Sequence, residues 1–421
     1  MTRREAHPPE RFVPAREGGL DGVHVLLGVA GGIAAYKGAE LVRRLRDAGA
    51  QVRVVLTENA ARFVTALTFQ ALSGHPVRSS LWDESAEAAM GHIELARWAD
   101  EVVIAPASAD LLARLAHGQA DDLLTTLCLA TAAPVSVAPA MNQQMWAHAA
   151  TQANVAVLRS RRVNVLGPAS GGQACGEFGA GRLLEADEIV SLLQRRRGPR
   201  ELAGTRVLVS AGPTYEDIDP VRFIGNRSSG RMGFAVAEAA ARAGAEVVLV
   251  AGPVALATPF GVERVDVRSA REMHDAVLAR AISADVFIAA AAVGDFRPRD
   301  VAPHKLKKAS RDSGLELSLV QNPDILADVA ALEPRPFVVG FAAETEEVEA
   351  HARAKLERKR LDLIAANEVG AGLGFESADN ALLLLWPDGR EVLERTGKVE
   401  LAQALISRIA ALRGARSSVR A

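Results

Sequence analysis

Apolar residues recur along this chain as short runs separated by amphipathic stretches. Residues 23–29 form one apolar run, long enough for a buried strand. Apolar residues then return at helical spacing over residues 39–48, and Gly49 ends that pattern. A second apolar run follows at residues 52–56. Strand, helix and strand in this order predict a βαβ unit and a parallel sheet.

The same alternation continues and starts afresh in the second half. RLRDAGAQVRVVL and AARAGAEVVLVAG share a helix, a glycine stop and a strand, which we interpret as a recurrence of the βαβ unit. We therefore predict an α/β protein with two Rossmann-like parallel-sheet domains. Further strands are predicted at residues 101–105, 135–138, 163–166, 206–210, 246–251, 286–290, 337–341 and 362–366, helices at 232–243 and 344–360, and a hairpin at 381–392 around Asp388-Gly389.

The pattern breaks once, at the basic and helix-breaking stretch QRRRGPRELAG. A chain of 421 residues also exceeds what one hydrophobic core usually supports. We predict a disordered tail at 1–20, a first domain at 21–192, a connection at 193–204, a second domain at 205–413 and a C-terminal tail at 414–421.

Composition narrows the class of protein. The formal net charge is −2 and only 4% of residues are aromatic, so nucleic acid is not an expected partner. Two cysteines cannot build a disulfide framework, and the N-terminal segment lacks the apolar core of a signal peptide, which favours the cytoplasm. Residues 123–141 carry no charge, but their Thr, Ser and Pro residues favour a buried helix and strand over a membrane span.

Four clusters in the first half carry candidate chemistry. The turn Gly31-Gly32 follows the first strand, although it matches neither G-x-G-x-x-G nor the Walker pattern and a turn without ligand explains it equally well. Ser108 and Asp110 in APASAD, and Asn142 in PAMN, follow strand ends, where open α/β sheets bind ligands. The glycine-rich segment 167–181 contains a cysteine and could close over a substrate. His92 is a candidate general base, or a packed histidine.

Taken together, GGIAAYK, GHIEL, APASAD, PAMN and ACG resemble the flavin-containing cysteine decarboxylases over residues 21–190. The resemblance implies a flavodoxin-like domain that binds FMN. Members oxidise the CH2–SH group of an acylated cysteine, decarboxylate it and return the electrons, because an amide nitrogen offers no electron sink. By this resemblance His92 and Asn142 hold or activate the substrate carboxylate and Cys175 donates a proton; the FMN-binding residues are Gly31, Gly32, Ser108, Asp110 and Met141.

The glycine-rich stretch at residues 207–233 organises the second half. Its glycines do not follow G-x-G-x-x-G, and no acid ends the next strand, which argues against a nicotinamide-dependent oxidoreductase. An acid at a strand end, Asp295, precedes the run Lys305-Leu306-Lys307-Lys308. These lysines form a solvated face or neutralise a triphosphate.

SAGPT, DPVRFIGNRSSGRMG, AAVGDF, KLKK, NPDI and GFAAET resemble the phosphopantothenate–cysteine ligases over residues 205–412. The resemblance implies that 4'-phosphopantothenate is activated by CTP as an acyl cytidylate, which the amine of L-cysteine then attacks, with Mg2+ on the phosphates. Asn226 would contact the acyl intermediate, Arg222, Lys307 and Lys308 the substrate, and the CTP-binding residues would be Asp295, Lys305, Phe341, Lys355 and Lys359.

The sequence departs from the ligase pattern at three places. Gly225 stands before Asn226 where a serine is familiar, Arg231 stands before the methionine where a lysine is familiar, and Gly294 stands where alanine is common. An arginine keeps the charge of a lysine but changes the geometry.

The two resemblances predict one bifunctional enzyme of the family that joins these two halves in coenzyme A biosynthesis. The alternative is a chain in which one half is only a binding or assembly module. By resemblance the protein is a homo-oligomer with trimeric decarboxylase and dimeric ligase parts, combining into a dodecamer. No sequence feature identifies the protein ligands of Mg2+.

Overall fold

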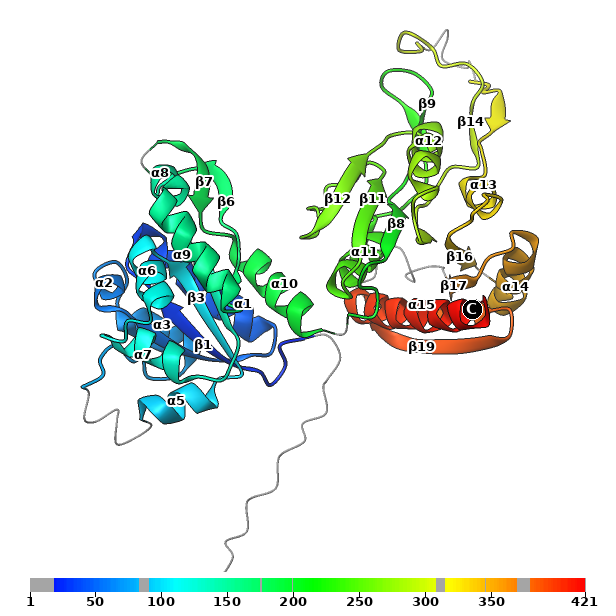
Figure 1. The fold of residues 1–421 in the computed structure, drawn as a ribbon. Coiled ribbons are helices and arrows are strands. Elements are labelled where there is room, and N and C mark those ends of the chain that lie inside the picture. Colours follow the sequence, from blue (N-terminus) through cyan, green and yellow to red (C-terminus); the bar gives the residue numbers. More distant parts are fainter. Residues whose placement is uncertain are drawn as a thin grey trace, which may run out of the picture. The chain divides into compact units, whose positions relative to one another are not determined.

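The computed structural model describes residues 19–82, 91–174, 176–198, 200–307, 315–344, 346–368 and 379–420 (Figure 1). It contains two compact units, Met1–Arg197 and Gly198–Ala421. Each unit is built on its own mixed or parallel sheet, as the strand pattern predicts.

The first unit is built on a five-stranded sheet in the order β2-β1-β3-β4-β5, and all its neighbouring strands are parallel. This order is that of flavodoxin-like folds. The strands are β1 (His24–Val29), β2 (Gln51–Leu56), β3 (Glu101–Ala107), β4 (Val135–Pro139) and β5 (Asn164–Val165).

Helices cover both faces of this sheet because neighbouring strand residues point to opposite sides. Val25 and Leu27 pack on the face covered by α1, α3 and α10, whereas Leu26 and Ile104 pack on the face of α5, α6, α7 and α9. The helices are η1 (Ile33–Tyr36), α1 (Lys37–Asp47), α2 (Glu58–Ala61), α3 (Ala66–Ser73), α5 (His92–Trp98), α6 (Ala109–His117), α7 (Leu123–Ala130), α8 (Gln143–Ala147), α9 (Ala149–Ser160) and α10 (Ala186–Arg197).

The second unit is built on an eight-stranded sheet in the order β12-β11-β8-β13-β16-β17-β18-β19. Its first six strands are parallel, β18 is antiparallel to β17, and β18 and β19 form an antiparallel hairpin. The strands are β8 (Arg206–Ala211), β11 (Glu246–Ala251), β12 (Val262–Asp266), β13 (Val286–Ala289), β16 (Phe337–Glu344), β17 (Leu363–Glu368), β18 (Asp379–Trp386) and β19 (Gly389–Gly397).

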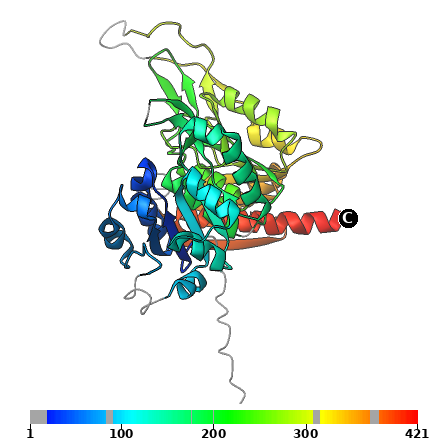
Figure 2. The same ribbon diagram turned by 60° about the vertical axis from the view of Figure 1, so that its left-hand side comes forward.

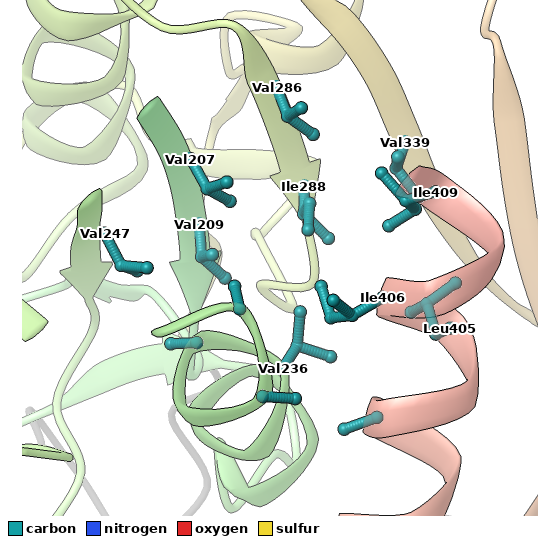
Figure 3. Packing of buried hydrophobic residues seen from close by; sticks show 14 of the residues in the cluster. Val207, Val209, Val236, Val247, Val286, Ile288, Val339, Leu405, Ile406 and Ile409 are labelled. Atoms are coloured by element: carbon teal, nitrogen blue, oxygen red, sulfur yellow. The ribbon is translucent and has the colours of Figure 1, made fainter. Parts of the chain in front are cut away.

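Two helices cover one face of this sheet, α11 (Arg231–Arg242) and α15 (Lys398–Arg420). Figure 3 shows Val209 and Ile288 of the strands facing Val236 of α11 and Ile406 of α15. The helix α15 is the long red helix of Figures 1 and 2 and packs along β19. The other face carries α12 (Ala270–Ala281), α13 (Ile325–Ala330) and α14 (Val348–Arg358).

Besides the two main sheets, the described part of the chain forms three two-stranded ribbons. In the first unit the glycine-rich segment forms a hairpin instead of a loop. In the second unit two ribbons follow strand ends. The ribbons are β6 (Ala169–Gly172) with β7 (Phe178–Arg182), β9 (Tyr215–Asp217) with β10 (Phe223–Gly225), and β14 (Phe296–Pro298) with β15 (Leu319–Gln321).

The glycine stop that recurs in the sequence has a conformational cause. Gly49 and Gly244 each follow a helix with φ near +90°, at 89° and 92°, a conformation that other residues adopt at a cost. The two βαβ units therefore turn from helix to strand in the same way.

Several predicted boundaries differ from the observed ones. The helix α10 continues to Arg197 through the start of the predicted connection, because Leu193 is fully buried and Arg196 pairs with buried Glu101. The helix α15 continues to Arg420 through the predicted tail, and Arg416 forms an ion pair of 2.8 Å with Asp362.

The strand predicted at 163–166 is only two residues long, β5. The helix predicted from residue 344 begins at Val348, because the preceding residues stay in β16 and pair with β17 up to Glu344. The uncharged run at residues 123–141 is the helix α7 followed by the strand β4, as predicted. Within the described ranges, no helix combines the length and the apolar character needed to cross a bilayer.

Candidate active sites

A cavity of about 720 Å3 opens in the first unit where β1, β3 and β4 end. After the adjacent strands β1 and β3 the chain turns toward opposite faces of the sheet. Doubly wound folds bind ligands at the place where neighbouring strands diverge in this way. Its lining residues come from the turns after these strands and from the β6–β7 hairpin, and they include Gly31, Gly32, Tyr36, Lys37, Ser108, Met141, Asn142, Met145, Gly172, Gln173, Gly181 and Arg182.

The two glycines after β1 have different roles. A Cβ atom on Gly31 would lie 2.4 Å from the Cβ of Asn59, so this glycine permits close packing against α2. A Cβ atom on Gly32 would have no atom within 4 Å, and its backbone is extended at φ 165°. Gly32 therefore keeps the cavity open and leaves its backbone accessible to a ligand.

We expect Gly31→Ala to destabilise the first unit by about 1–3 kcal/mol, because the added methyl overlaps Asn59. Gly32→Ala adds the same methyl without a clash, so the unit should keep its thermal stability and lose flavin affinity. Thermal unfolding and fluorescence titration with FMN measure the two effects. Equal flavin affinity in Gly32→Ala and the unmodified chain would contradict a role for Gly32 in flavin binding.

The PAMN turn is held against the β6–β7 hairpin. The backbone N–H of Met141 donates to the carbonyl of Gly181 at 2.9 Å. Asn142 caps α8 by accepting from the Gln144 N–H at 2.8 Å, while its Nδ2 donates to the Glu177 carboxylate at 2.6 Å. The amide of Asn142 is therefore oriented to donate to a carboxylate.

Positive charge lies at one end of this cavity. Lys37 contacts Glu185 at 2.9 Å, and Arg182 contacts the same carboxylate at 2.6 Å. The hydrogen bond from Lys37 is the main cause that holds the pKa of Glu185 below its usual range. Lys37 and Arg182 line the cavity and were not singled out from the sequence, because neither follows a strand directly.

The cavity brings together five of the predicted residues: Gly31, Gly32, Ser108, Met141 and Asn142. Asp110 does not line it; its exposed carboxylate on α6 lies 3.9 Å from Arg114. His92 is the first residue of α5 and does not line it either. Cys175 lies outside the described residues, although its neighbours Gln173 and Ala174 line the cavity. Cys128 packs in the core, and burial raises the pKa of its thiol to about 12.

The residues of this cavity fit a flavin nucleotide. A volume of this size and a mixed lining of methionines, a tyrosine and a few polar groups are typical of cofactor sites. The N-terminus of α6 at Ser108, together with Lys37 and Arg182, provides donors and positive charge for a phosphate.

A second cavity, of about 490 Å3, opens at the carboxyl edge of the larger sheet. It lies beside the N-terminus of α11 and the ends of β13, β16 and β17. Its lining includes Asn226, Arg227, Ser228, Ser229, Arg231, Phe341, Asn367, Asn380 and Lys398.

Asn226 is fixed at the mouth of this cavity by the turn after β13. Its Nδ2 donates to the carbonyl oxygens of Ala292 and Val293 at 3.3 and 3.0 Å. The neighbouring N–H of Gly294 donates to the hydroxyl of fully buried Thr214 at 2.9 Å, which holds this turn in place. The predicted contact residue of the acyl intermediate is therefore oriented by two backbone carbonyls.

Arg222 does not line this cavity. Its Nη2 donates to Asp219 and to the carbonyl of Leu306, each at 2.6 Å, and the Leu306 N–H donates back to Asp219 at 3.1 Å. Burial alone would raise the pKa of Asp219, but these donors outweigh it and hold that pKa well below its usual range. Arg222 thus holds the segment of Lys305 and Lys307 in place, and its contact with the substrate stays a prediction.

The predicted nucleotide-binding residues divide into two groups. Phe341 lines the cavity, and Lys355 donates to its carbonyl at 2.8 Å. Lys359 instead pairs with Asp324 at 2.8 Å. Asp295 and Lys305 are exposed and do not line the cavity. Of the lysines predicted to bind the substrate, Lys307 is also exposed and does not line the cavity, and Lys308 lies outside the described residues.

This cavity is also lined by cations that were not predicted to bind the nucleotide, namely Arg227, Arg231 and Lys398. No spacing in the sequence links Lys398 to the Ser-Ser-Gly turn, because the two meet only through the packing of α15 on α11. Among the described residues, no group of three or more His, Cys, Asp or Glu side chains could hold a metal ion.

The two units define a flavin-type doubly wound domain followed by a second Rossmann-like domain. Residues 15–198 match the family model described as Flavoprotein, and residues 202–412 match the model described as DNA/pantothenate metabolism flavoprotein C-terminal domain. The chain belongs to the family of coenzyme A biosynthesis bifunctional proteins.

Relatives with the name "Coenzyme A biosynthesis bifunctional protein CoaBC" are similar along most of this chain. The protein of Vibrio parahaemolyticus is 56% identical over 392 residues, which cover 93% of this chain and 98% of the relative. The protein of Escherichia coli K12 is 56% identical over 394 residues, covering 93% and 97%. The protein of Bacillus subtilis is 44% identical over 399 residues, covering 93% and 98%.

Proposed function

We propose that the second unit joins L-cysteine to 4'-phosphopantothenate and that the first unit decarboxylates the resulting 4'-phosphopantothenoylcysteine to 4'-phosphopantetheine. One observation carries this proposal. Each unit has a cavity at the carboxyl edge of its sheet, and a motif of the corresponding enzyme lines each one, PAMN in the first and GNRSSGRMG in the second.

In the second unit the carboxylate of 4'-phosphopantothenate attacks the α-phosphate of CTP, and pyrophosphate leaves. The amine of cysteine then attacks the acyl carbon, and CMP leaves. Asn226 holds the acyl intermediate, and Arg227 and Arg231 offset the negative charge. Phe341 lines the cavity that takes the nucleotide, and Lys355 donates to the Phe341 carbonyl. Asp295, Lys305 and Lys359 remain predicted contacts of the nucleotide.

Mg2+ enters with the nucleotide in this proposal. Mg2+ is held mainly by phosphate oxygens and water, with one or two carboxylates, and does not require a preformed cluster of protein ligands.

In the first unit Asn142 donates to the carboxylate of the substrate. The chain already directs this amide at a carboxylate, that of Glu177, and the substrate would replace it. Bound FMN supplies the electron sink that the amide nitrogen of the substrate cannot provide. Cys175 donates the proton that completes the aminoethanethiol product, and His92 holds or activates the carboxylate.

His92 does not line the cavity of its own chain, and we propose that a second copy supplies this residue to the site. We expect His92→Asn and Asn142→Asp each to abolish CO2 release when expressed alone. If the two variants assemble at random into trimers on co-expression, about one quarter of all sites would contain both native residues, and decarboxylation should return to that fraction. Absence of recovery in verified mixed oligomers would contradict sites shared between copies.

Two readouts test the two halves separately. The purified chain should be yellow with bound FMN, and it should release CMP and pyrophosphate only when 4'-phosphopantothenate, CTP and cysteine are all present. A chain that binds FMN but releases no CMP would show that the second unit is only a binding or assembly module.

A further inference from the structure

The cavity of the second unit lies between the first turns of two packed helices. The helix α11 begins at Arg231 and α15 begins at Lys398, and both residues line the cavity. The two helices share one hydrophobic core on the same face of the sheet (Figure 3). Their N-termini are therefore fixed relative to each other.

The start of α11 has no side-chain cap. Its N-cap residue is Gly230 in a left-handed conformation, and its first turn contains no acid. The first backbone N–H groups of a helix have no partner inside the helix, and they bind anions when no side chain caps them. The first-turn acid of α15, Glu400, is exposed and does not line the cavity.

The charges around the cavity are of one sign. Its lining residues include three cations, Arg227, Arg231 and Lys398, and among the described residues no aspartate or glutamate lines it. Burial lowers the pKa of Lys398, and the nearby guanidinium of Arg231 adds to this effect. A polyanion in the cavity would relieve the repulsion between these two cations.

We propose that Lys398 binds the phosphate chain of the nucleotide, so that the chain is held between the N-termini of α11 and α15. This inference rests on the proposed ligase function. Of the predicted nucleotide lysines, Lys355 donates to the carbonyl of Phe341 and Lys359 pairs with Asp324, and neither of them lines the cavity. Lys398 lines the cavity together with Asn367 and Asn380 and provides positive charge there.

The closing hairpin and the start of α15 thereby become part of the nucleotide site. The helix position of Lys398 is set by buried Leu401, Leu405 and Ile409, which fasten α15 to the sheet. Because Lys398 binds the phosphates, the affinity for CTP depends on the correct folding of the C-terminal segment.

The test uses the full chain with Lys398→Ala, Lys398→Arg and the matched control Arg395→Ala, an exposed cation of β19 that does not line the cavity. Calorimetric titration with CTP and Mg2+ should give an affinity about tenfold lower for Lys398→Ala, an intermediate loss for Lys398→Arg and no change for the control. Inhibition by inorganic pyrophosphate should weaken in the same order.

A second arm identifies which anion Lys398 contacts. The KM for CTP should rise in Lys398→Ala, while the KM for 4'-phosphopantothenate and the rate of decarboxylation stay within about twofold. A rise confined to the KM for 4'-phosphopantothenate would overturn the inference, as would unchanged CTP affinity. If the unmodified chain itself bound no CTP, the proposed ligase function would fail and not merely the role of Lys398.

Discussion

Asn226→Asp should abolish formation of 4'-phosphopantothenoylcysteine while leaving the fold of the second unit intact. The native amide donates to the carbonyls of Ala292 and Val293, and a carboxylate of the same shape cannot donate to either. It would also place a negative charge beside a cavity that binds an anionic intermediate. Loss of one oriented contact of this kind lowers rates by about 100-fold or more.

Mass spectrometry of the ligase products, with Asn226→Ala as the matched variant, measures this effect. The alanine variant removes the donor without adding charge, so it should retain more activity than the aspartate variant. Decarboxylation of supplied 4'-phosphopantothenoylcysteine by the same preparation controls for folding. Ligation at the normal rate in Asn226→Asp would refute the assignment of this residue.

Gly181→Ala should eliminate flavin binding and decarboxylation and leave ligation unchanged. Gly181 has φ +137°, and an added Cβ would lie 2.3 Å from the carbonyl oxygen of Met141. That oxygen belongs to the backbone of the PAMN turn and cannot rotate away. We expect a cost of about 2–4 kcal/mol at the contact between the turn and the hairpin.

Gly179→Ala on the same strand is the matched control. Its Cβ would lie 2.1 Å from the Oε1 of Gln143, which can rotate away, and 3.0 Å from the Cβ of Gln143, so a smaller overlap remains than at Gly181. Flavin absorbance per chain and the yield of 4'-phosphopantetheine compare the two variants. Equal flavin content in both would show that the fit of Gly181 against Met141 does not shape the cavity.

Local features of the sequence predict most of the fold. Apolar runs such as residues 23–29 and 286–290 identify central strands, because both faces of a parallel sheet are covered. The ends of elements are less well predicted, since tertiary contacts decide them. The helix α10 keeps its basic last turn because buried Glu101 pairs with Arg196.

The candidate sites show the same division between local and long-range information. Residues that directly follow strands, such as Gly32, Ser108 and Asn142, line the cavity as expected, because strand ends meet at one edge of the sheet. The roles of cations depend on distant partners. Arg222 contacts Asp219 and Leu306, and Lys398 reaches its cavity only through the packing of α15.

The most direct test of the whole account follows the carboxyl carbon of cysteine through one reaction mixture. Purified chain is incubated with 4'-phosphopantothenate, CTP, Mg2+ and cysteine labelled at its carboxyl carbon, and the products are measured by mass spectrometry. The account predicts equal amounts of CMP, labelled CO2 and unlabelled 4'-phosphopantetheine. Labelled 4'-phosphopantothenoylcysteine that accumulates without CO2 on flavin-loaded protein, or 4'-phosphopantetheine without CMP, would contradict it.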